Sequence, residues 1–569
     1  MPHLYSLKIS HFRGIQNLEA TFGEAKFVAL IGRGDSGKTT ILKAIAAVLS
    51  PNWNISFNDW DFYECKTEEP IVIEAIVKDL PEELLKENKY GLCLGLLRDG
   101  SIIYDLDNMG QEESEESEKI LTIRLTVTDT LEPKWSVISG VNRDIETEIS
   151  ANDRAKLKMF QVSDYIDNHF SYSKGSPLYT LLKQSIEDKK LPANKIVEMV
   201  RKAYSAIHEH NEFSEFDDVK KQIVTLAKGV GLRIDDLNTF IEFRENAYSE
   251  SNITLHSENI PYRLHGKGSK RLLSIAIQKG LMDEGGIVLI DELEQGLEPD
   301  RSRNLAGLLK LTDNGQVFVT THSREVIAEV STDNLFLICH GEKQLRTFAE
   351  GYQGLLRRIP ESVLAKRVIC CEGATEVGII RAFDEYLQQD RGYGLAALGI
   401  VYVDCHGGNQ FYKDAILLNK QGIDSCVFAD DDTREDLEKA KREAAKHNIR
   451  GVLCDRGKAI EDMLFAYLPW EVVLKMLCYA EKVHNHQKIY PILTFNGLAD
   501  LKILSDTVEQ QKVRDDCARR AKDNKWYKRI DHGEFLGNMW IRHIDSFSGD
   551  CGLVKEYKAM IDWIGNDID

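Results

Sequence analysis

Residues 27–49 read FVALIGRGDSGKTTILKAIAAVL: an apolar run, a glycine-rich turn and a second apolar run with helical spacing. The turn matches the pattern G-x-x-x-x-G-K-[ST], and it lies between a predicted strand and a predicted helix, the context that gives the pattern meaning. Backbone N–H groups of such a turn surround phosphate oxygens, while Lys38 reaches the outer phosphates and Thr39 offers a hydroxyl to Mg²⁺. We therefore expect an α/β domain that binds ATP through Gly32, Arg33, Gly34, Asp35, Ser36, Gly37, Lys38, Thr39 and Thr40.

Two further predicted strands end in polar residues that suit the same nucleotide site. The apolar run 287–290 is followed directly by Asp291 and Glu292. In ATPases with this kind of glycine turn, an aspartate at such a strand end holds Mg²⁺ and another residue orients the attacking water. We expect Asp291 to take the first role and Glu292 the second. A third strand, 316–321, ends before His322, which is expected near the terminal phosphate.

The order of these motifs resembles the ABC-type ATPases, and in particular their RecF-like and SMC-like branch. Residues 7–14, LKISHFRG, are similar to the opening strand of that branch, and residues 265–271, HGKGSKR, occupy the place of its signature turn. The resemblance implies that nucleotide binds between paired heads, with the signature turn of one head facing the glycine turn of the other. The turn residues that would do so are Gly266, Gly268 and Ser269, although this turn departs from the usual S-G-G-Q.

A third block of the chain begins near residue 366 with a short apolar strand. The run 368–371 is followed by Glu372, and the stretch EGATE continues to Glu376. If a helix begins after Glu372, the two glutamates lie one turn apart and can point into the same crevice. This pair is a candidate for metal binding.

Three consecutive aspartates follow another apolar run, 427–429. Side chains alternate along a strand, so Asp430 and Asp432 are expected to point one way and Asp431 the other. Glu461 adds a carboxylate further along. Like charges gathered in this way are unfavourable without a cation, and hard cations such as Mg²⁺ or Mn²⁺ prefer oxygen ligands. The pattern predicts one or two such ions, which can stabilise the attacking and leaving oxygens of a phosphodiester.

The carboxylates resemble the Toprim domain that topoisomerases, primases and a nuclease family share. Glu372 matches the glutamate of that domain, Asp430 and Asp432 match its D-x-D, and residues 405–409, CHGGN, are similar to the turn after its second strand. An ABC-type ATPase followed directly by Toprim resembles the OLD (overcoming lysogenisation defect) nucleases. Their relatives include the nuclease subunit of Gabija antiphage defence and some retron-associated effectors. The resemblance covers nearly the whole chain.

The resemblance implies a metal-dependent DNA endonuclease or nickase that is regulated by ATP binding or hydrolysis and serves in antiphage defence. The resemblance supports Glu372, Asp430 and Asp432 as metal ligands, and the pattern of carboxylates adds Glu376 and Glu461 to the predicted set. The resemblance also implies a lysine that stabilises charge on the phosphate during cleavage. Our choice is Lys528, with Lys522 and Lys525 as alternatives.

Hydrophobic patterning divides the chain into four ranges with an α/β fold. The ATPase is expected in two parts, residues 1–150 and 253–360. A Rossmann-like Toprim domain that ends in a basic segment is expected at residues 361–569. Between the two ATPase parts, residues 151–252 carry apolar residues at helical spacing, for example over 223–230. We expect a helical insertion there, either a dimerisation arm or a plain domain core.

Composition limits the class of protein further. The net charge of −19 argues against a protein that coats nucleic acid nonspecifically. Residues 512–529 nevertheless carry eight Lys or Arg against three Asp, which suits either a DNA-contacting surface or a solvated helix face. The chain lacks any run of 18 apolar residues, and its eleven cysteines include no C-x-x-C pair. These features indicate a cytoplasmic protein with reduced thiols and no membrane partner.

Several alternatives stay open at this point. The chain could be an ATP-driven DNA clamp without cleavage, or its Toprim domain could cut RNA. ATP could be hydrolysed or only sensed. Paired heads favour a homodimer or larger assembly, and a helicase-like subunit or a retron RNA–DNA molecule would be the first partners to test.

Overall fold

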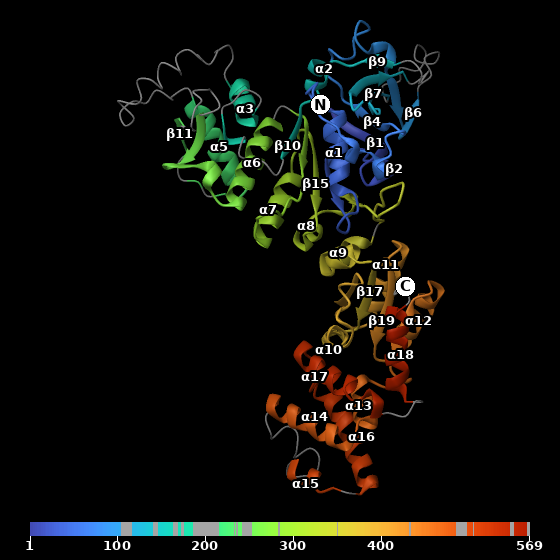
Figure 1. Cartoon of the computed structure of the whole chain (residues 1–569). Helices are drawn as coiled ribbons and strands as arrows, with labels where there is room; N and C mark the ends of the chain where they lie inside the picture. Colours follow the sequence, from blue (N-terminus) through green and yellow to red (C-terminus); the bar gives the residue numbers. More distant parts are fainter. Residues whose placement is uncertain are drawn as a thin grey trace. The chain divides into compact units, whose positions relative to one another are not determined.

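The computed structural model describes residues 1–103, 117–139, 146–162, 169–171, 176–185, 216–232, 234, 237–241, 253–282, 285–349, 351–431, 434–484, 498–504, 506–546 and 551–565. The chain forms two compact units, Met1–Glu350 and Gly351–Asp569. In Figure 1 the first unit runs from blue to yellow-green and the second from yellow to red. Among the described residues, no helix has the length and apolar content that a membrane span requires.

The first unit contains an antiparallel sheet in the order β2-β1-β4-β7-β5-β6, with β8 paired to β7 and β9 to β8. Residues along β4 and β7 are nearly all buried, so this sheet is covered on both faces over its centre. Its strands are β1 (His3–Phe12), β2 (Ile15–Thr21), β4 (Ile71–Lys78), β5 (Gly95–Arg98), β6 (Ser101–Ile103), β7 (Glu118–Val127), β8 (Pro133–Ile138) and β9 (Glu146–Glu148).

A parallel sheet in the order β10-β14-β15-β3-β16 holds the nucleotide motifs. Its central strands are continuous apolar runs because a parallel sheet is buried on both faces. The strands predicted at the glycine turn and before Asp291 and His322 are confirmed. The five strands are β3 (Phe27–Ile31), β10 (Met159–Val162), β14 (Ile287–Ile290), β15 (Gln316–Thr321) and β16 (Leu335–Leu337).

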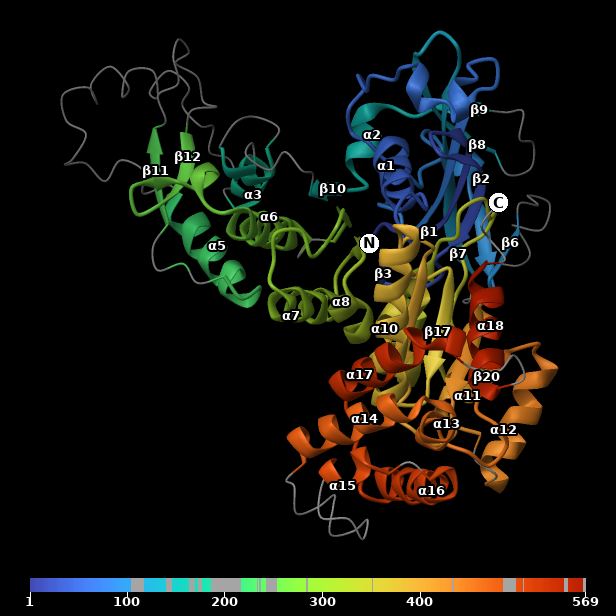
Figure 2. The ribbon, with the colours of Figure 1, turned by 60° about the horizontal axis from the view of Figure 1, so that its bottom comes forward.

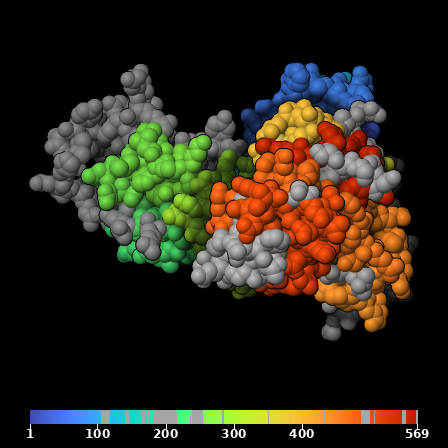
Figure 3. All heavy atoms as spheres, turned by 90° about the horizontal axis from the view of Figure 1, so that it is seen from below, coloured from blue at the N-terminus to red at the C-terminus, as the bar shows by residue number. Residues whose placement is uncertain are grey.

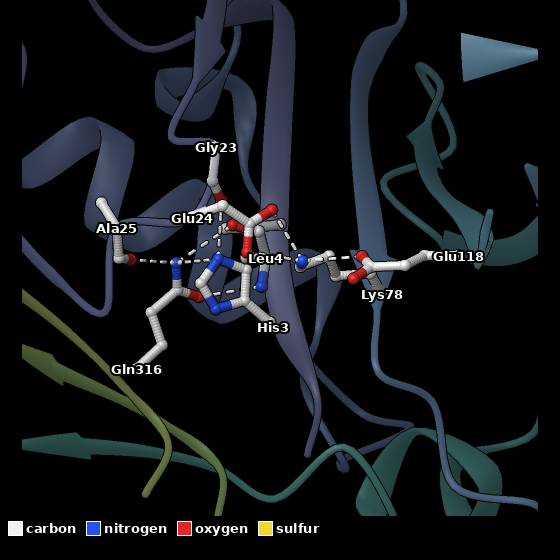
Figure 4. A network of polar contacts seen from close by, with 8 residues as sticks. All are labelled: His3, Leu4, Gly23, Glu24, Ala25, Lys78, Glu118 and Gln316. Atoms are coloured by element: carbon white, nitrogen blue, oxygen red, sulfur yellow. Dashed lines mark hydrogen bonds and ion pairs between the residues drawn. The ribbon is translucent and has the colours of Figure 1, made fainter. Parts of the chain in front are cut away.

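A buried glutamine ties the two sheets together (Figure 4). Gln316, at the start of β15, accepts a hydrogen bond from the backbone N–H of Leu4 at 2.8 Å and donates to the carbonyls of Leu4 and Ala25 at 3.1 and 3.0 Å. Beside it, the buried ammonium of Lys78 bonds Glu24 and Glu118, each at 2.7 Å. The first strand of the chain is thereby held against the parallel sheet.

The helices of the first unit connect these strands, and the region expected as a helical insertion differs from that expectation. Within 151–252, β10 pairs in parallel with β14, and β11 (Leu237–Ile241) pairs with β12 (Ile253–Ser257), which also pairs with β13 (Ile260–Pro261). Residues 186–215 of this region lie outside the described residues. The helices are α1 (Lys38–Val48), α2 (Ala151–Ala155), α3 (Pro177–Ser185), α5 (Asp217–Gly229), α6 (Lys267–Met282), α7 (Pro299–Lys310) and α8 (Arg324–Glu329).

The second unit is built on a four-stranded parallel sheet in the order β18-β17-β19-β20. The strands are β17 (Arg367–Cys371), β18 (Ile400–Asp404), β19 (Asp424–Ala429) and β20 (Arg450–Leu453). The chain steps from β17 to β18 and then back across β17 to β19. Right-handed crossovers therefore place the helix after β17 and the helix after β18 on opposite faces of the sheet.

Helices surround this sheet, as Figure 2 shows. They are α9 (Tyr352–Arg358), α10 (Ala374–Arg391), α11 (Gln410–Lys420), α12 (Glu435–Lys446), α13 (Ile460–Tyr467), α14 (Trp470–Val483), α15 (Leu498–Lys502), α16 (Thr507–Asp523), α17 (Ile530–Ile541) and α18 (Gly552–Gly565). The largest core lies between one face of the sheet and α10, α13, α14 and α16 to α18. Glycines let α10 and α17 approach closely, because a Cβ on Gly378 would lie 2.1 Å from the Ile530 carbonyl oxygen.

Candidate functional site

The parallel sheet of the second unit brings two predicted metal ligands side by side. Since all four strands run in the same direction, their carboxyl ends share one edge of the sheet, and Glu372 and Asp430 follow two neighbouring strands. The Glu372 backbone N–H donates to the carbonyl oxygen of Phe428 at 3.0 Å. The Asp430 backbone N–H donates to Glu372 Oε2 at 3.3 Å. The two acidic residues thus lie within reach of a common ligand.

Glu376 lies at the start of α10 and points back toward this edge. Its carboxylate accepts a hydrogen bond from the Gly373 backbone N–H at 2.9 Å, which caps the helix. The side chain is buried, and burial together with the nearby Asp430 raises the pKa of Glu376 well above its ordinary value. Glu372 and Glu376 flank the same helix start, as the EGATE spacing predicts.

The position of Asp430 differs from the expectation that this residue lies on a strand with alternating side chains. Strand β19 ends at Ala429, so Asp430 lies just past the strand, where side chains no longer alternate by position. Asp430 Oδ1 accepts the Ile460 backbone N–H at 2.8 Å and faces the Cys454 thiol at 3.9 Å. Burial, followed by the charge of Glu461, raises the pKa of Asp430 to about 7. The second predicted aspartate, Asp432, lies outside the described residues.

Glu461 and Lys528 complete the cluster. Glu461, in the first turn of α13, is fully buried, and neither carboxylate oxygen finds a hydrogen-bond partner among the described residues. Lys528 Nζ lies 3.7 Å from Glu461 Oε1. Burial acts to lower the pKa of Lys528, but Glu461, Glu376 and Asp430 outweigh it and hold that pKa above its ordinary value. The ammonium is therefore charged at neutral pH and faces the carboxylates.

The chain around Lys528 explains why this lysine, among three, faces the cluster. The preceding carbonyl, of Tyr527, accepts a hydrogen bond from Thr375 Oγ1 at 3.0 Å, which fixes the segment against the start of α10. Lys522 instead lies 3.6 Å from Asp462. Other cations of the basic stretch, such as Arg520, pair with acids of their own helix.

The chemistry of the cluster fits divalent ions. Among the described residues, no three His, Cys, Asp or Glu side chains already form a group that could hold a metal ion. In the described part of the chain, the carboxylates of this cluster nevertheless outnumber the lysine that faces them, and Glu461 makes no hydrogen bond there that would offset its burial. Oxygen donors alone suit Mg²⁺ or Mn²⁺ rather than softer metals. Bound ions would relieve the repulsion between these groups.

Two carboxylates at the same edge and one deep in the core were not expected from the sequence. Asp404 ends β18 and accepts the His406 backbone N–H at 2.7 Å, and Asp455 follows β20. Their positions at strand ends could have identified both. Glu556, in α18, is buried and has no hydrogen-bond partner within the described ranges, and no local pattern marks it.

The first unit assembles the predicted nucleotide site around Lys38. Lys38 Nζ donates to the carbonyls of Gly32 and Arg33 at 3.0 and 2.7 Å, and burial lowers the pKa of Lys38 to about 8. Thr39 Oγ1 donates to Asp291 Oδ1 at 3.1 Å, so both predicted Mg²⁺ ligands meet. Gly34, Asp35, Ser36 and Gly37 form the turn between β3 and α1, and Thr40 lies in the first turn of α1.

Glu292 and His322 lie beside this pair. Glu292 is exposed after β14, and its backbone N–H donates to Thr320 Oγ1 at 2.7 Å. Burial, with the Lys38 charge next, lowers the pKa of His322. A residue that the sequence reasoning missed, Glu294, positions this histidine by accepting its backbone N–H at 2.6 Å.

The predicted signature turn lies at the start of α6. Gly266 is exposed, whereas a Cβ on Gly268 would lie 2.4 Å from the Gly296 carbonyl oxygen. Ser269 lies in the first turn of this helix. Arg271, one turn further, donates to the Asp291 backbone carbonyl. Within one chain the predicted signature turn therefore packs beside the end of β14, where Asp291 and Glu292 follow the strand. Its contact with a second head stays a prediction.

Two family models match the sequence. One, described as "AAA domain, putative AbiEii toxin, Type IV TA system", matches residues 27–328, more than half of the chain. The other, "Overcoming lysogenization defect protein-like, TOPRIM domain", matches residues 363–432. No curated protein matches the sequence.

Solved structures with a similar fold are matched over the first part of the chain. The Smc head bound to the C-terminal winged-helix domain of ScpA has 14% identity and a TM-score of 0.37, covering 62% of this chain and 99% of that one. A Pyrococcus furiosus Smc head with an extended coiled coil, bound to the C-terminal domain of ScpA, has 13% identity, a TM-score of 0.39 and coverages of 63% and 99%. The recombination mediator RecF with ATP has 12% identity, a TM-score of 0.37 and coverages of 61% and 98%.

Proposed function

We propose that this chain, which belongs to the AAA-type ATPase family and carries an OLD-like TOPRIM domain, is a metal-dependent DNA endonuclease or nickase controlled by ATP. The two domains are those of an OLD-like nuclease with an ATPase: the first implies ATP use and the second divalent metal binding. The observation that carries the proposal is the group of Glu372, Glu376, Asp430 and Glu461 beside Lys528, of which Glu376 and Glu461 are buried.

The carboxylates at the sheet edge would hold the ions that supply a nucleophilic hydroxide and neutralise charge on the scissile phosphate. The Asp430 backbone N–H holds the Glu372 carboxylate at 3.3 Å, and the Ile460 backbone N–H holds the Asp430 carboxylate at 2.8 Å, so both side chains are ordered before an ion binds. The helix cap made by Glu376 orients a third carboxylate in the same way. Asp432, which follows Asp430 by two residues, and Glu461 would complete the ligands.

Lys528 would stabilise the negative charge that builds on the phosphate oxygens during cleavage. Its ammonium stays protonated because acidic neighbours hold its pKa above the ordinary value. Removing one preorganised donor of this kind typically lowers the rate constant about 100-fold or more.

The nucleotide site of the first unit would regulate this chemistry. Lys38 would exchange its contacts with the Gly32 and Arg33 carbonyls for the outer phosphates of ATP. Thr39 and Asp291 would hold Mg²⁺, and Glu292 would orient water for hydrolysis. His322, next to Lys38, would respond to the terminal phosphate.

We further propose that the chain acts as an antiphage effector in a homodimer or larger assembly. Gly266, Gly268 and Ser269 at the start of α6 would contact the nucleotide of a second head. A helicase-like subunit or a retron RNA–DNA molecule would deliver the signal.

Plasmid cleavage tests the proposal directly. Purified wild-type chain is incubated with supercoiled plasmid, or with RNA of matched length, and with Mg²⁺ or Mn²⁺. We expect the wild type to cleave the plasmid. Asp430→Ala should abolish this cleavage, whereas Asp562→Asn, on the exposed side of α18, should leave it intact. Binding of DNA without cleavage by the wild type would favour an ATP-driven clamp, and cleavage of RNA alone would assign the domain to RNA.

A further inference from the structure

Helix α9 is the first element of the second unit and directly follows the ATPase unit along the chain. The first unit ends at Glu350, and α9 begins at Tyr352. A change in the ATPase unit that acts along the chain therefore meets α9 before any other element of the second unit.

Side chains at both ends of α9 contact α11, the helix that follows β18. Tyr352 Oη donates a hydrogen bond to the Leu417 carbonyl at 2.8 Å. At the other end of α9, Arg358 Nη2 donates to Asp414 Oδ1 at 2.6 Å, and the two side chains form an ion pair. Two contacts at separate points fix both the position and the direction of α9 relative to α11.

The acidic partner in this ion pair is fully buried. Asp414 has no exposed surface, and its second carboxylate oxygen finds no hydrogen-bond partner among the described residues. Separating Arg358 from Asp414 would leave a buried charge without its partner, which is strongly unfavourable, whereas replacing both by uncharged side chains often costs little. We therefore expect α9 and α11 to move together.

The start of α11 is joined to a turn that contacts one of the proposed metal ligands. Gln410, the first residue of α11, donates to the same Asp414 oxygen at 2.7 Å. In the preceding turn, His406 has a left-handed backbone with a φ of 61°, which persists only where the surroundings hold it. The Gly407 N–H donates to the Glu372 carbonyl oxygen at 2.7 Å. A displacement of α11 would therefore shift the backbone that presents Glu372.

Helix α11 lies on the face of the sheet opposite α10. The large core with α10, α13, α14 and α16 to α18 covers the other face, and its later helices form much of the orange and red surface in Figure 3. In contrast, α11 packs on β17, β19 and α12. The position of α11 is therefore set by the sheet, α12 and α9 rather than by that core.

We propose that the Arg358–Asp414 ion pair transmits the state of the nucleotide site to the cleavage centre: α9 carries the change to α11, and α11 shifts the turn that contacts Glu372. This inference rests on the proposed function, because it explains how ATP would control cleavage. It assigns a regulatory contact to Arg358, which lies between the two matched ranges, 27–328 and 363–432.

The test removes the ion pair without leaving a buried charge. In the double variant Arg358→Met/Asp414→Asn, the asparagine still accepts from Gln410. Arg357→Met, at an exposed position on the same helix, is the matched control. Plasmid cleavage is measured with Mg²⁺ in the presence and absence of a non-hydrolysable ATP analogue.

In the wild type and in Arg357→Met, the analogue should change the cleavage rate about fivefold or more, a usual size for the coupling between two sites. In the double variant, the rates with and without the analogue should agree within about twofold, because the coupling is gone. The rate without nucleotide should stay close to that of the wild type, since the proposed metal ligands and Lys528 are intact.

Hydrogen exchange of the backbone amides gives a second readout that needs no cleavage. In the wild type, the analogue should change the exchange rates over residues 405–420 as well as in the ATPase unit. In the double variant, it should change them in the ATPase unit alone, which also shows that the variant folds and binds the nucleotide.

Three results would overturn the inference: a wild type whose cleavage ignores the analogue, a double variant that keeps the wild-type response, or an equal loss of response in Arg357→Met. If the wild type cuts no nucleic acid, the proposed function fails, and the exchange over residues 405–420 still decides whether nucleotide binding reaches the turn. If the double variant does not fold, Tyr352→Phe decides, because it removes the other contact between α9 and α11 and should also weaken the response.

Discussion

The backbone N–H of Asp430 donates to the carboxylate of Glu372, a residue 58 positions earlier in the chain. Each acid follows a strand of one parallel sheet, and the two strands are neighbours. This contact orders the Glu372 carboxylate before any ion is bound, and the Ile460 backbone N–H orders that of Asp430 at 2.8 Å. The proposed nuclease centre depends on that preorganisation.

Neutralising Glu376 should stabilise the metal-free protein. The pKa of this buried acid is raised, so at neutral pH folding must protonate a group that is ionised in the unfolded chain. Glu376→Gln keeps an oxygen to cap Gly373 and removes that cost. We expect the variant to be about 1–3 kcal/mol more stable than wild type at pH 7, with the difference shrinking toward pH 4.5. Urea unfolding in a chelator at both pH values measures this.

The same substitution should abolish cleavage and the stabilisation by divalent ions. Wild type should melt at a higher temperature when Mn²⁺ is added, because an ion that binds only the folded state stabilises it. Glu376→Gln should show a smaller shift. A gain in cleavage, or an equal Mn²⁺ shift in both proteins, would contradict the assignment of Glu376 as a ligand.

Cleavage should rise with pH up to about 7 and then level off. The pKa of Asp430 is raised to about 7, and only the ionised carboxylate can hold a cation. Below that pKa the ionised fraction grows tenfold for each pH unit, so the rate at limiting Mg²⁺ should grow by about that factor between pH 5 and pH 6. Initial rates of plasmid cleavage measure the profile.

A rise in Mg²⁺ concentration should move the pH midpoint to lower values, since the ion competes with the proton for Asp430. A midpoint that stays fixed from limiting to saturating Mg²⁺ would show that another group sets the profile.

Lys528 should be distinguishable from its two neighbours in the basic stretch. Lys528→Ala is expected to lower kcat about 100-fold with little change in DNA affinity, because the ammonium acts on charge that develops during the reaction. Lys522→Ala and Lys525→Ala are matched controls and should change kcat by less than about threefold. A loss of similar size in either control would move the role away from Lys528.

Variants of the nucleotide site should show whether the protein must hydrolyse ATP or only bind it. Lys38→Ala should lose binding of a fluorescent ATP analogue, because the lysine that faces the outer phosphates is gone. Glu292→Gln should keep binding and lower ATP hydrolysis about 100-fold or more. If DNA cleavage is unchanged in Glu292→Gln but altered in Lys38→Ala, bound ATP is the signal and its hydrolysis is not required.

Much of the fold could be read from local patterns. The glycine turn between β3 and α1 and the strand before Asp291 are short-range signals, because backbone geometry and hydrophobic period act over a few residues. The positions of Glu372 and Asp430, each directly after an apolar run, likewise indicated that both lie at one edge of the sheet. The described part of residues 151–252 holds the helices α2, α3 and α5, and also β10, whose four residues in the parallel sheet carry little periodic signal.

The sequence by itself determined the chemistry that each segment offers: a phosphate-binding turn, acids after apolar strands, and a choice of lysines. Only the tertiary structure decided that Lys528 faces Glu461 at 3.7 Å, and that Glu461 is fully buried. These groups are far apart along the chain and sit on helices whose local sequence carries no mark of their partners. Their meeting is set by how helices pack on the sheet, which depends on shape complementarity across the whole core.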